Sequence, residues 1–160
     1  MSSIATAFSD FAEMPEPKKE ELNVVEVVEL AIDIFNRDQI SFKPSSSKIL
    51  ANFDRTQLIR VITNLLKNAF QAIPEDRNPE INVNISEKDD DVNISISDNG
   101  YGISKTYMEK IFEPSFTTKS SGMGLGLSMI KSIITAYNGS ITFTSKSNVG
   151  TTFNITFPKK

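Results

Sequence analysis

Two stretches of strict alternation between apolar and polar residues restrict the fold of this chain more than any other feature. Ile81–Ile85 and Val92–Ile96 each place an apolar side chain at every second position, which is typical of strands with one buried face. The charged residues Lys88–Asp91 lie between them and predict a solvated hairpin turn. The sequence therefore predicts antiparallel strands that bury only one face.

A first helix of the domain is predicted N-terminal to this hairpin, from Asn23. Asn23 can cap its first turn, and Glu26, three residues later, is placed to complete a capping box. Apolar residues recur at helical spacing from Val24 to Phe35. Two short strand-like segments, 40–43 and 48–53, follow this helix.

A second helix is predicted from Asp54, whose carboxylate can cap it and whose partner in a capping box is Gln57. It is expected to run to about Ile73 and to stop before Pro74. Residues 65, 66, 69, 72 and 73 are all apolar and are expected to form its buried side.

The C-terminal third continues with further elements of both kinds. We expect a short helix from about Ser104, a helix over 125–137 that ends at Gly139, and strands over 140–145 and 151–157. Helices and strands segregate instead of alternating regularly. The sequence therefore predicts an α+β fold, a two-layer sandwich with three main helices on one face of a mixed sheet of about five strands.

Composition fits one globular domain in a chain of 160 residues, and a net charge of −3 gives no basic field for nucleic acid. The absence of Cys excludes disulfides and fits a cytoplasmic location. No apolar run reaches about 18 residues, so we expect no membrane contact. Residues 1–11 are compatible with a helix, and the two prolines in Met14–Glu21 predict a break. We therefore expect a boundary that separates residues 1–21 from a domain over 22–160.

Asn64 and Asn68 are four residues apart, so they share one face of the second predicted helix. An amide oxygen is a hard, neutral ligand, and Mg²⁺ typically takes one or two protein oxygens. Asn68 is therefore a candidate magnesium ligand. The alternative is that both are ordinary solvent-facing helix residues.

Asp98 follows a predicted strand and precedes Gly100 and Gly102. A carboxylate here can accept a hydrogen bond from an exocyclic amine such as that of adenine, and glycines let a flat base approach the backbone. The alternative is an ordinary turn, because Asp-Asn-Gly is a common turn sequence.

Gly122–Leu127 contains three glycines and opens a predicted helix, where free N–H groups and the helix dipole favour phosphate. Lys119 can add a cation. The Walker pattern is absent, and no strand precedes these glycines as the dinucleotide pattern requires. The stretch from Ser115 to Gly122 instead predicts a lid that becomes ordered when phosphates bind.

Phe112 and Phe116 flank Glu-Pro-Ser. Both can anchor this loop in the core, or they can dock onto another domain. The chain has neither His nor Cys, so no catalytic triad and no zinc site of the usual kind can form within it.

These segments together resemble the catalytic and ATP-binding domain of two-component sensor histidine kinases, in the superfamily shared with gyrase-type, chaperone and mismatch-repair ATPases. Asn64–Ile73 is similar to the N box, Asp98–Gly102 and Gly122–Leu127 to the glycine boxes, and Phe112–Phe116 to the F box. Residues 8–17 resemble the end of the dimerisation helix and linker of nitrogen-regulation-type kinases.

The resemblance implies ATP and Mg²⁺ as ligands. It implies catalytic roles for Asn64, Asn68 and Lys119, with Asn68 on the metal. It implies nucleotide contacts from Asn68, Asp98, Gly100, Gly102, Ile103, Thr118, Gly122, Met123, Gly124, Leu125, Gly126, Leu127 and Thr151.

The resemblance also implies transfer of the γ-phosphate to a His on a separate dimerisation domain, a homodimeric full-length kinase that an upstream segment can anchor in the inner membrane, and a downstream response regulator. Hydrolases of the superfamily carry Glu where this chain has Asn64, and an amide cannot take a proton from water. Two alternatives remain, namely a serine kinase of the anti-sigma-factor type and a nucleotide-binding interaction module without transfer activity.

Overall fold

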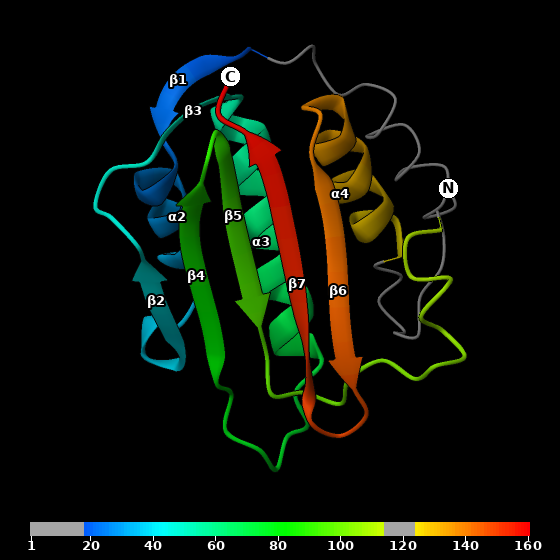
Figure 1. Ribbon diagram of the computed structural model, residues 1–160. Helices are drawn as coiled ribbons and strands as arrows, with labels where there is room; N and C mark the ends of the chain where they lie inside the picture. The colour runs from blue at the N-terminus through cyan, green and yellow to red at the C-terminus, as the bar shows by residue number, and fades with distance from the viewer. Residues whose placement is uncertain (1–17, 114–123) are drawn as a thin grey trace, which may run out of the picture.

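The computed structural model describes residues 18–113 and 124–160. Helices α2, α3 and α4 lie together on one face of a five-stranded sheet, and within these residues the other face carries no helix (Figure 1). The predicted two-layer α+β sandwich is therefore confirmed. In chain order the elements are β1 (Glu20–Asn23), α2 (Val24–Ile32), the 3₁₀ turn η1 (Arg37–Gln39), β2 (Ile40–Pro44), β3 (Leu50–Phe53), α3 (Arg55–Gln71), β4 (Ile81–Lys88), β5 (Asp91–Ser97), α4 (Gly124–Ala136), β6 (Ser140–Lys146) and β7 (Gly150–Pro158).

The main sheet has the strand order β2-β4-β5-β7-β6, in which only β2 and β4 run parallel. Its register aligns the apolar residues of neighbouring strands, for example Ile85 with Ile94 and Ile94 with Ile155. These side chains are buried against the helices, which confirms the half-buried strands that the alternation predicts.

Both predicted helix caps are present. The Asn23 side chain accepts hydrogen bonds from the backbone N–H groups of Val25 (3.1 Å) and Ile49 (3.0 Å). Asp54 Oδ1 accepts from the N–H of Gln57 (3.0 Å). The return bond expected from the Gln57 side chain to the N–H of Asp54 is replaced, because that N–H donates to the hydroxyl of Tyr137 (3.1 Å).

Tyr137 joins the C-terminal end of α4 to the N-terminal end of α3. Its ring stacks on Phe53 with 3.8 Å between centroids, and its hydroxyl donates to Gln57 Oε1 (3.1 Å). Burial raises the pKa of this tyrosine above its ordinary value of 10.0. The other carboxylate oxygen of Asp54 accepts from the N–H of Lys18 (2.7 Å), so the start of the described chain is held at the same place.

Three local predictions were wrong, each because of longer-range contacts or turn geometry. β1 begins at Glu20, within the predicted break, because it pairs with β3. The expected helix after Ser104 is a series of turns closed by i to i+3 bonds, such as Tyr107 N–H to Ser104 O (3.0 Å). At the end of α4 it is Asn138, with φ of 63°, that takes the left-handed conformation.

Gly139 is required for a different reason than the one predicted. A Cβ at this position would lie 2.3 Å from the carbonyl oxygen of Thr156 and 2.9 Å from the Cβ of Phe157. The residue therefore lets the end of α4 approach β7. Its N–H donates to Ile134 O (2.9 Å), which completes the bonding of the last helical turn.

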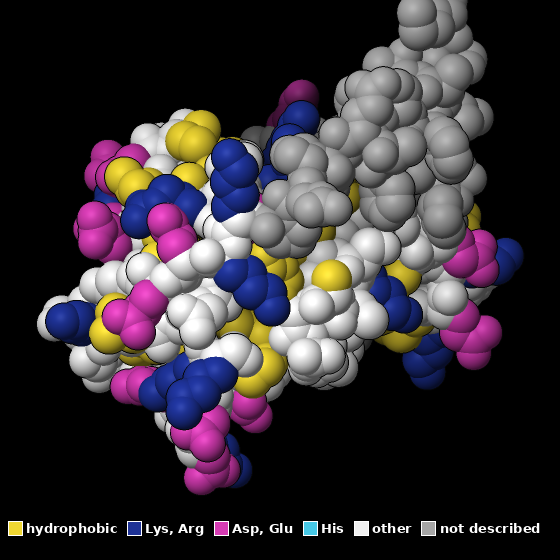
Figure 2. Space-filling view, turned by 90° about the horizontal axis from the view of Figure 1, so that it is seen from above, with side chains coloured by type: hydrophobic (Ala, Val, Ile, Leu, Met, Phe, Trp, Pro, Cys, Tyr) yellow, Lys and Arg dark blue, Asp and Glu magenta, His cyan; other side chains and the backbone are white. Residues whose placement is uncertain are grey.

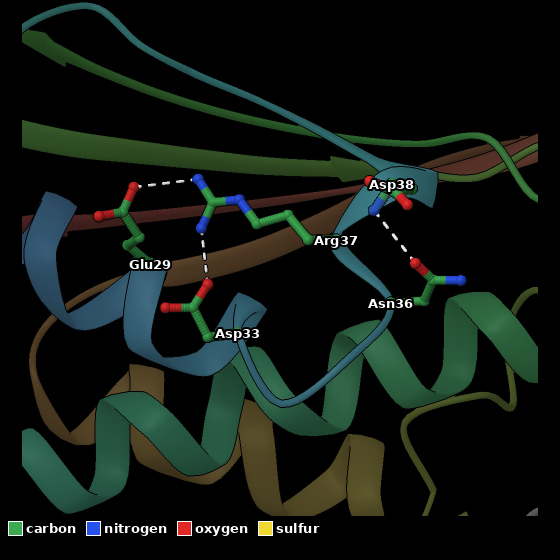
Figure 3. Close-up of polar contacts among 5 residues, drawn as sticks. All are labelled: Glu29, Asp33, Asn36, Arg37 and Asp38. Carbon is green, nitrogen blue, oxygen red and sulfur yellow. Dashed lines mark hydrogen bonds and ion pairs between the residues drawn. The ribbon is translucent and has the colours of Figure 1, made fainter.

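Charged groups on the surface form exposed pairs. Arg37 donates to Asp33 Oδ1 (2.6 Å) and Glu29 Oε2 (3.1 Å) beside the C-terminal end of α2, and Asn36 caps η1 (Figure 3). Such exposed pairs contribute little to stability. Among the described residues visible in Figure 2, Lys and Arg are interspersed with Asp and Glu on the end that carries β1 and β3.

Candidate functional site

The loop after β5 holds the candidate adenine ligand Asp98. Its Oδ1 accepts hydrogen bonds from the backbone N–H groups of Gly100 (2.9 Å) and Thr151 (3.3 Å), and its own N–H donates to Thr151 O (2.9 Å). The carboxylate is half-buried at the junction of β5 and β7. Two backbone N–H donors thus fix the orientation of this carboxylate, which can accept hydrogen bonds from a ligand.

Close backbone approaches account for the glycines of this loop. A Cβ on Gly100 would lie 2.5 Å from Ala72 O, at the C-terminal end of α3. Gly102 has a φ of 76°, and a Cβ there would lie 2.4 Å from Lys146 O. The loop therefore lies between α3 and the β6–β7 hairpin. The N–H of Tyr101 donates to Ala72 O (2.8 Å), and the carbonyl oxygen of Tyr101 accepts from the N–H of Asn148 (2.6 Å). Larger residues at these glycines would displace the loop.

Side-chain hydrogen bonds join the loop before β4 to this segment. Arg77 Nη1 donates to the carbonyl oxygens of Asn99 (2.5 Å) and Gly100 (3.2 Å). The Asn99 side chain accepts from Glu80 N–H (2.9 Å) and donates to Asn78 O (2.9 Å). No motif marks Arg77, because its carbonyl partners are defined only by the fold.

An open pocket of about 260 Å³ lies beside Asp98. It is lined by Asp98, Thr144, Ser145, Lys146, Val149, Gly150, Thr151 and Thr152. Thr151 is buried, and its hydroxyl oxygen lies 2.8 Å from that of Ser145. Of the predicted nucleotide contacts, the structure therefore brings Asp98 and Thr151 together at one pocket. Ile103 joins them indirectly, because its N–H donates to Ser145 Oγ (2.7 Å).

Asn64 and Asn68 lie in the C-terminal half of α3, and both are half-buried. Their helix buries Leu65, Leu66 and Ala69, as expected. Ala72 and Ile73, expected on the buried side, are only half-buried because the helix ends there and the chain turns toward β4. The hydroxyl of Thr63, next to Asn64, is buried and has no hydrogen-bond partner among the described residues.

Helix α4 starts at Gly124, within the predicted phosphate segment, and buries Ile130 and Ile134. A Cβ added at Gly126 would meet no described atom within 4 Å, so packing among the described residues does not require this glycine. Leu127 packs against the core. Thr118, Lys119, Gly122 and Met123 lie outside the described residues, as do Phe116, the predicted lid over 115–122 and the side chain of Leu125.

Phe112 anchors its segment to the core, as one of the two interpretations expects. Its ring lies 5.9 Å from that of Phe143 in an edge-to-face arrangement, and Lys131 Nζ lies 5.2 Å from its centroid. Within the described ranges, 18–113 and 124–160, no group of three or more acidic, His or Cys side chains could hold a metal ion. None of the helices in these ranges is long and apolar enough to span a membrane.

Residues 53–160 match the family described as histidine kinase-, DNA gyrase B- and HSP90-like ATPase. Sporulation kinase A of Bacillus subtilis is 34% identical over 170 aligned residues, which cover all of this chain and 28% of that protein. Sensor protein FixL of Bradyrhizobium diazoefficiens is 36% identical over 121 residues, 75% of this chain and 24% of FixL. A putative NtrY-like sensor histidine kinase of Rickettsia conorii is 32% identical across the whole chain and 27% of its own length.

Solved structures agree with these relatives. The nucleotide-free catalytic domain of histidine kinase ThkA superposes with a TM-score of 0.79 at 31% identity, over 89% of this chain and 96% of that domain. This chain spans about a quarter of the length of the curated relatives that it matches. The predicted class, an ATP-binding domain of the sensor-kinase type, is confirmed, and the NtrY-like relatives agree with the predicted subfamily. The chain belongs to the histidine kinase-, DNA gyrase B- and HSP90-like ATPase family.

Proposed function

We propose that this domain binds ATP with Mg²⁺ and positions the γ-phosphate for in-line attack by a His on a separate dimerisation domain. The observation that supports this most directly is the Asp98 carboxylate, which two backbone N–H groups hold beside an open pocket. Phosphoryl transfer depends mostly on placement and on neutralisation of charge. The residues of this domain would therefore act by binding and orienting the nucleotide.

Asp98 is assigned to the exocyclic amine of adenine. Its Oδ1 is occupied by two backbone donors, which fixes the direction of the carboxylate before the base arrives. Gly100 and Gly102 keep the adjoining backbone close to α3 and the β6–β7 hairpin, and Thr151 lines the same pocket. Such preorganisation reduces the entropy that binding must offset.

The N-terminal end of α4 is assigned to the phosphates. Its first-turn N–H groups and the positive end of the helix dipole favour an anion, and Gly126 leaves the space beside this turn open among the described residues. Gly122 and Leu125 belong to the same segment of the sequence, and by resemblance to the family Thr118 and Lys119 contribute as well.

Asn68 is assigned to magnesium. The described residues offer no acidic cluster, so their donors fit an ion that takes most of its oxygen ligands from phosphates and water. Asn68 is half-buried on α3, and an amide oxygen suits such a site. When bound, the ion supplies positive charge that offsets the charge on the phosphate oxygens.

Asn64 and the absence of His both indicate that another protein segment accepts the phosphoryl group. The amide of Asn64 cannot accept a proton at neutral pH, so water at this position is not activated by it. None of the 160 residues is His, so a phosphohistidine cannot form within them. We therefore propose slow hydrolysis of ATP and transfer to a His supplied by a partner.

The proposed partner is the His-containing dimerisation domain of the same full-length kinase, which would be a homodimer located in the cytoplasm or anchored in the inner membrane. A response regulator would receive the phosphoryl group afterwards. The relatives support this proposal because they include a sensor protein, a sporulation kinase and a putative sensor histidine kinase, each several times as long as this chain. Phe116 stays a candidate for the docking surface, whereas Phe112 packs on the core.

Incubation with ATP labelled on the γ-phosphate tests the proposal. Label should appear on an added helical hairpin that bears a His, as an acid-labile phosphoramidate, and not on the same hairpin with His replaced by Gln. Acid-stable label on this chain would contradict the proposal and indicate a Ser, Thr or Tyr kinase. Rapid release of free phosphate would indicate a hydrolase instead.

A further inference from the structure

Arg77, in the loop between α3 and β4, bonds to two successive carbonyl groups of the loop after β5. Its side chain is half-buried, and its Nη1 donates to the carbonyl oxygens of Asn99 (2.5 Å) and Gly100 (3.2 Å). Nη1 carries two protons, so this one nitrogen can bond to both carbonyls. Arg77 is itself placed by the turn after α3, because its backbone N–H donates to Pro74 O (3.1 Å).

The two carbonyls belong to peptide units whose N–H groups bond elsewhere in the site. Both units are trans, so C=O and N–H point in opposite directions. The unit with the Asn99 carbonyl supplies the N–H of Gly100, which donates to Asp98 Oδ1 (2.9 Å). The next unit supplies the N–H of Tyr101, which donates to Ala72 O (2.8 Å). The guanidinium therefore holds one side of two peptide units, and Asp98 and the end of α3 hold the other side.

The peptide unit between Asn99 and Gly100 needs such a contact to keep its orientation. A residue without a Cβ adopts many backbone conformations, so sterics at Gly100 offer little resistance to a flip of this unit. A flip would remove one of the two N–H donors of Asp98. It would also turn the Asn99 carbonyl toward that carboxylate, and neither group can donate to the other. The bond from the guanidinium to the Asn99 carbonyl opposes this flip.

We propose that Arg77 is a positioning residue for nucleotide binding, which acts through Asp98. It holds the carbonyls of Asn99 and Gly100, so that the carboxylate keeps the orientation in which it binds the nucleotide. This inference rests on the proposed binding of ATP at Asp98, and it assigns Arg77 no contact with the nucleotide. A site that is competent for only a fraction of the time binds more weakly by that fraction. Loss of the guanidinium should therefore lower affinity.

The test measures ATP and ADP affinity by calorimetry on the parent, Arg77→Met and Arg77→Lys. Arg77→Met keeps a long apolar side chain and removes the donors. It should weaken both nucleotides equally, by about tenfold, as for a loop that is competent about a tenth of the time. Arg77→Lys keeps a charged donor and should stay within about threefold of the parent. Arg55→Met, which removes an exposed ion pair with Glu20 at the first turn of α3, is the matched control and should change neither affinity.

Kinetics provide a readout that a general loss of folded protein would not reproduce. In phosphoryl transfer to the added hairpin that bears a His, Arg77→Met should raise the KM for ATP about tenfold. Its kcat at saturating ATP should equal that of the parent, because bound nucleotide selects the competent loop. A lower kcat with an unchanged KM would contradict the proposed role.

Three further results would overturn the inference. They are parental affinity of Arg77→Met for both nucleotides, a larger loss for ATP than for ADP, which would indicate a contact with the terminal phosphate, and an equal loss in Arg77→Lys and Arg77→Met. A measurement on the parent does not depend on how the variants fold. By NMR, the Nη1 protons of Arg77 should exchange slowly with solvent even without nucleotide, and rapid exchange would also overturn the inference. Failure of the parent to bind ATP at all would instead reject the proposed function.

Discussion

At the N-terminal end of α3, Asp54, Gln57 and Tyr137 are buried and hydrogen-bonded to one another. Toward its C-terminal end, Asn68 is half-buried. Asp98 is also half-buried and lines an open pocket, in the loop that contacts Ala72 at the end of α3. The first end is closed by aromatic stacking of Tyr137 on Phe53. At the second end, Gly100 lets the loop after β5 approach Ala72 closely.

This difference implies that one end of α3 contributes mainly to stability and the other mainly to nucleotide binding. Buried polar groups that bond to each other stabilise the native packing and present nothing to a ligand. A carboxylate can accept several hydrogen bonds, so one that backbone donors orient at a pocket can also accept from a ligand. Changes at the closed end should therefore lower the free energy of unfolding, and changes at the open end should lower nucleotide affinity.

The largest effect is expected for Phe53→Ala. Phe53 is fully buried, and its ring contacts those of Tyr137 and Phe157. The ring centroids of Phe53 and Phe157 lie 4.9 Å apart. The cavity should lower the free energy of unfolding by about 3–5 kcal/mol in denaturant titrations. The folded fraction should bind ATP with parental affinity. Leu50→Ala, on the exposed part of the same strand, is the control, and an equal loss for both would contradict the closed-end assignment.

Asp98→Ala should reverse this pattern. Loss of the carboxylate leaves the amine of adenine without its acceptor, which should weaken ATP binding by about 1.5–3 kcal/mol, or roughly ten- to more than a hundredfold. Asp91 lies at the other end of β5, where its side chain is exposed. Asp91→Ala is therefore the control and should leave ATP affinity unchanged. Parental ATP affinity of Asp98→Ala in calorimetry would remove Asp98 from the adenine site.

Asn68→Ala should act on magnesium dependence. Removal of the amide oxygen should raise the Mg²⁺ concentration needed for nucleotide binding by at least about tenfold, with little change in the thermal midpoint. Asn68→Asp should also disturb binding, because it adds negative charge beside the phosphates. Asn82→Ala, on an exposed strand position, is the control. Parental Mg²⁺ dependence in both Asn68 variants would mean that another residue binds the ion.

Tyr137→Phe should have the smallest effect and a characteristic pH dependence. Loss of the hydroxyl removes its bonds to Asp54 and Gln57 and should destabilise by about 1–2 kcal/mol near neutral pH. Burial raises the pKa of Tyr137 above 10.0 in the folded protein. Above this pH the unfolded chain therefore loses a proton that the folded protein keeps, and parental stability falls.

The stability difference between the parent and Tyr137→Phe should thus be complete below about pH 10 and shrink as the pH rises further. Denaturant titrations at neutral and alkaline pH measure it. A difference that stays constant across this range would show that Tyr137 ionises equally in the folded and unfolded states.

Sequence reasoning found what neighbouring residues determine. The caps Asn23 and Asp54 bond to residues two and three positions away, and the strands around the β4–β5 hairpin follow from local alternation. It failed where partners are distant. β1 forms because Glu20 pairs with Phe53, and Tyr137 closes the end of α3 across 80 residues. Neither contact can be predicted from the residues next to it in the sequence.

The candidate site shows the same division. Asp98, Gly100 and Gly102 were identifiable because glycines next to a carboxylate form a local pattern. Ser145 and Arg77 were not, since an isolated Ser in a strand or Arg in a loop has no distinctive spacing. Their roles depend on which carbonyl or hydroxyl the fold brings near them.

Amide hydrogen exchange with and without ATP and Mg²⁺ tests most directly whether nucleotide binds at the open end of α3. Protection should increase over residues 98–103, at the β6–β7 hairpin around 145–151, and in the half of α3 that carries Asn64 and Asn68. Exchange in β1, in β3 and around Tyr137 should stay unchanged. Unchanged exchange over 98–103 and 145–151 at saturating nucleotide, or protection confined to the closed end, would contradict the account.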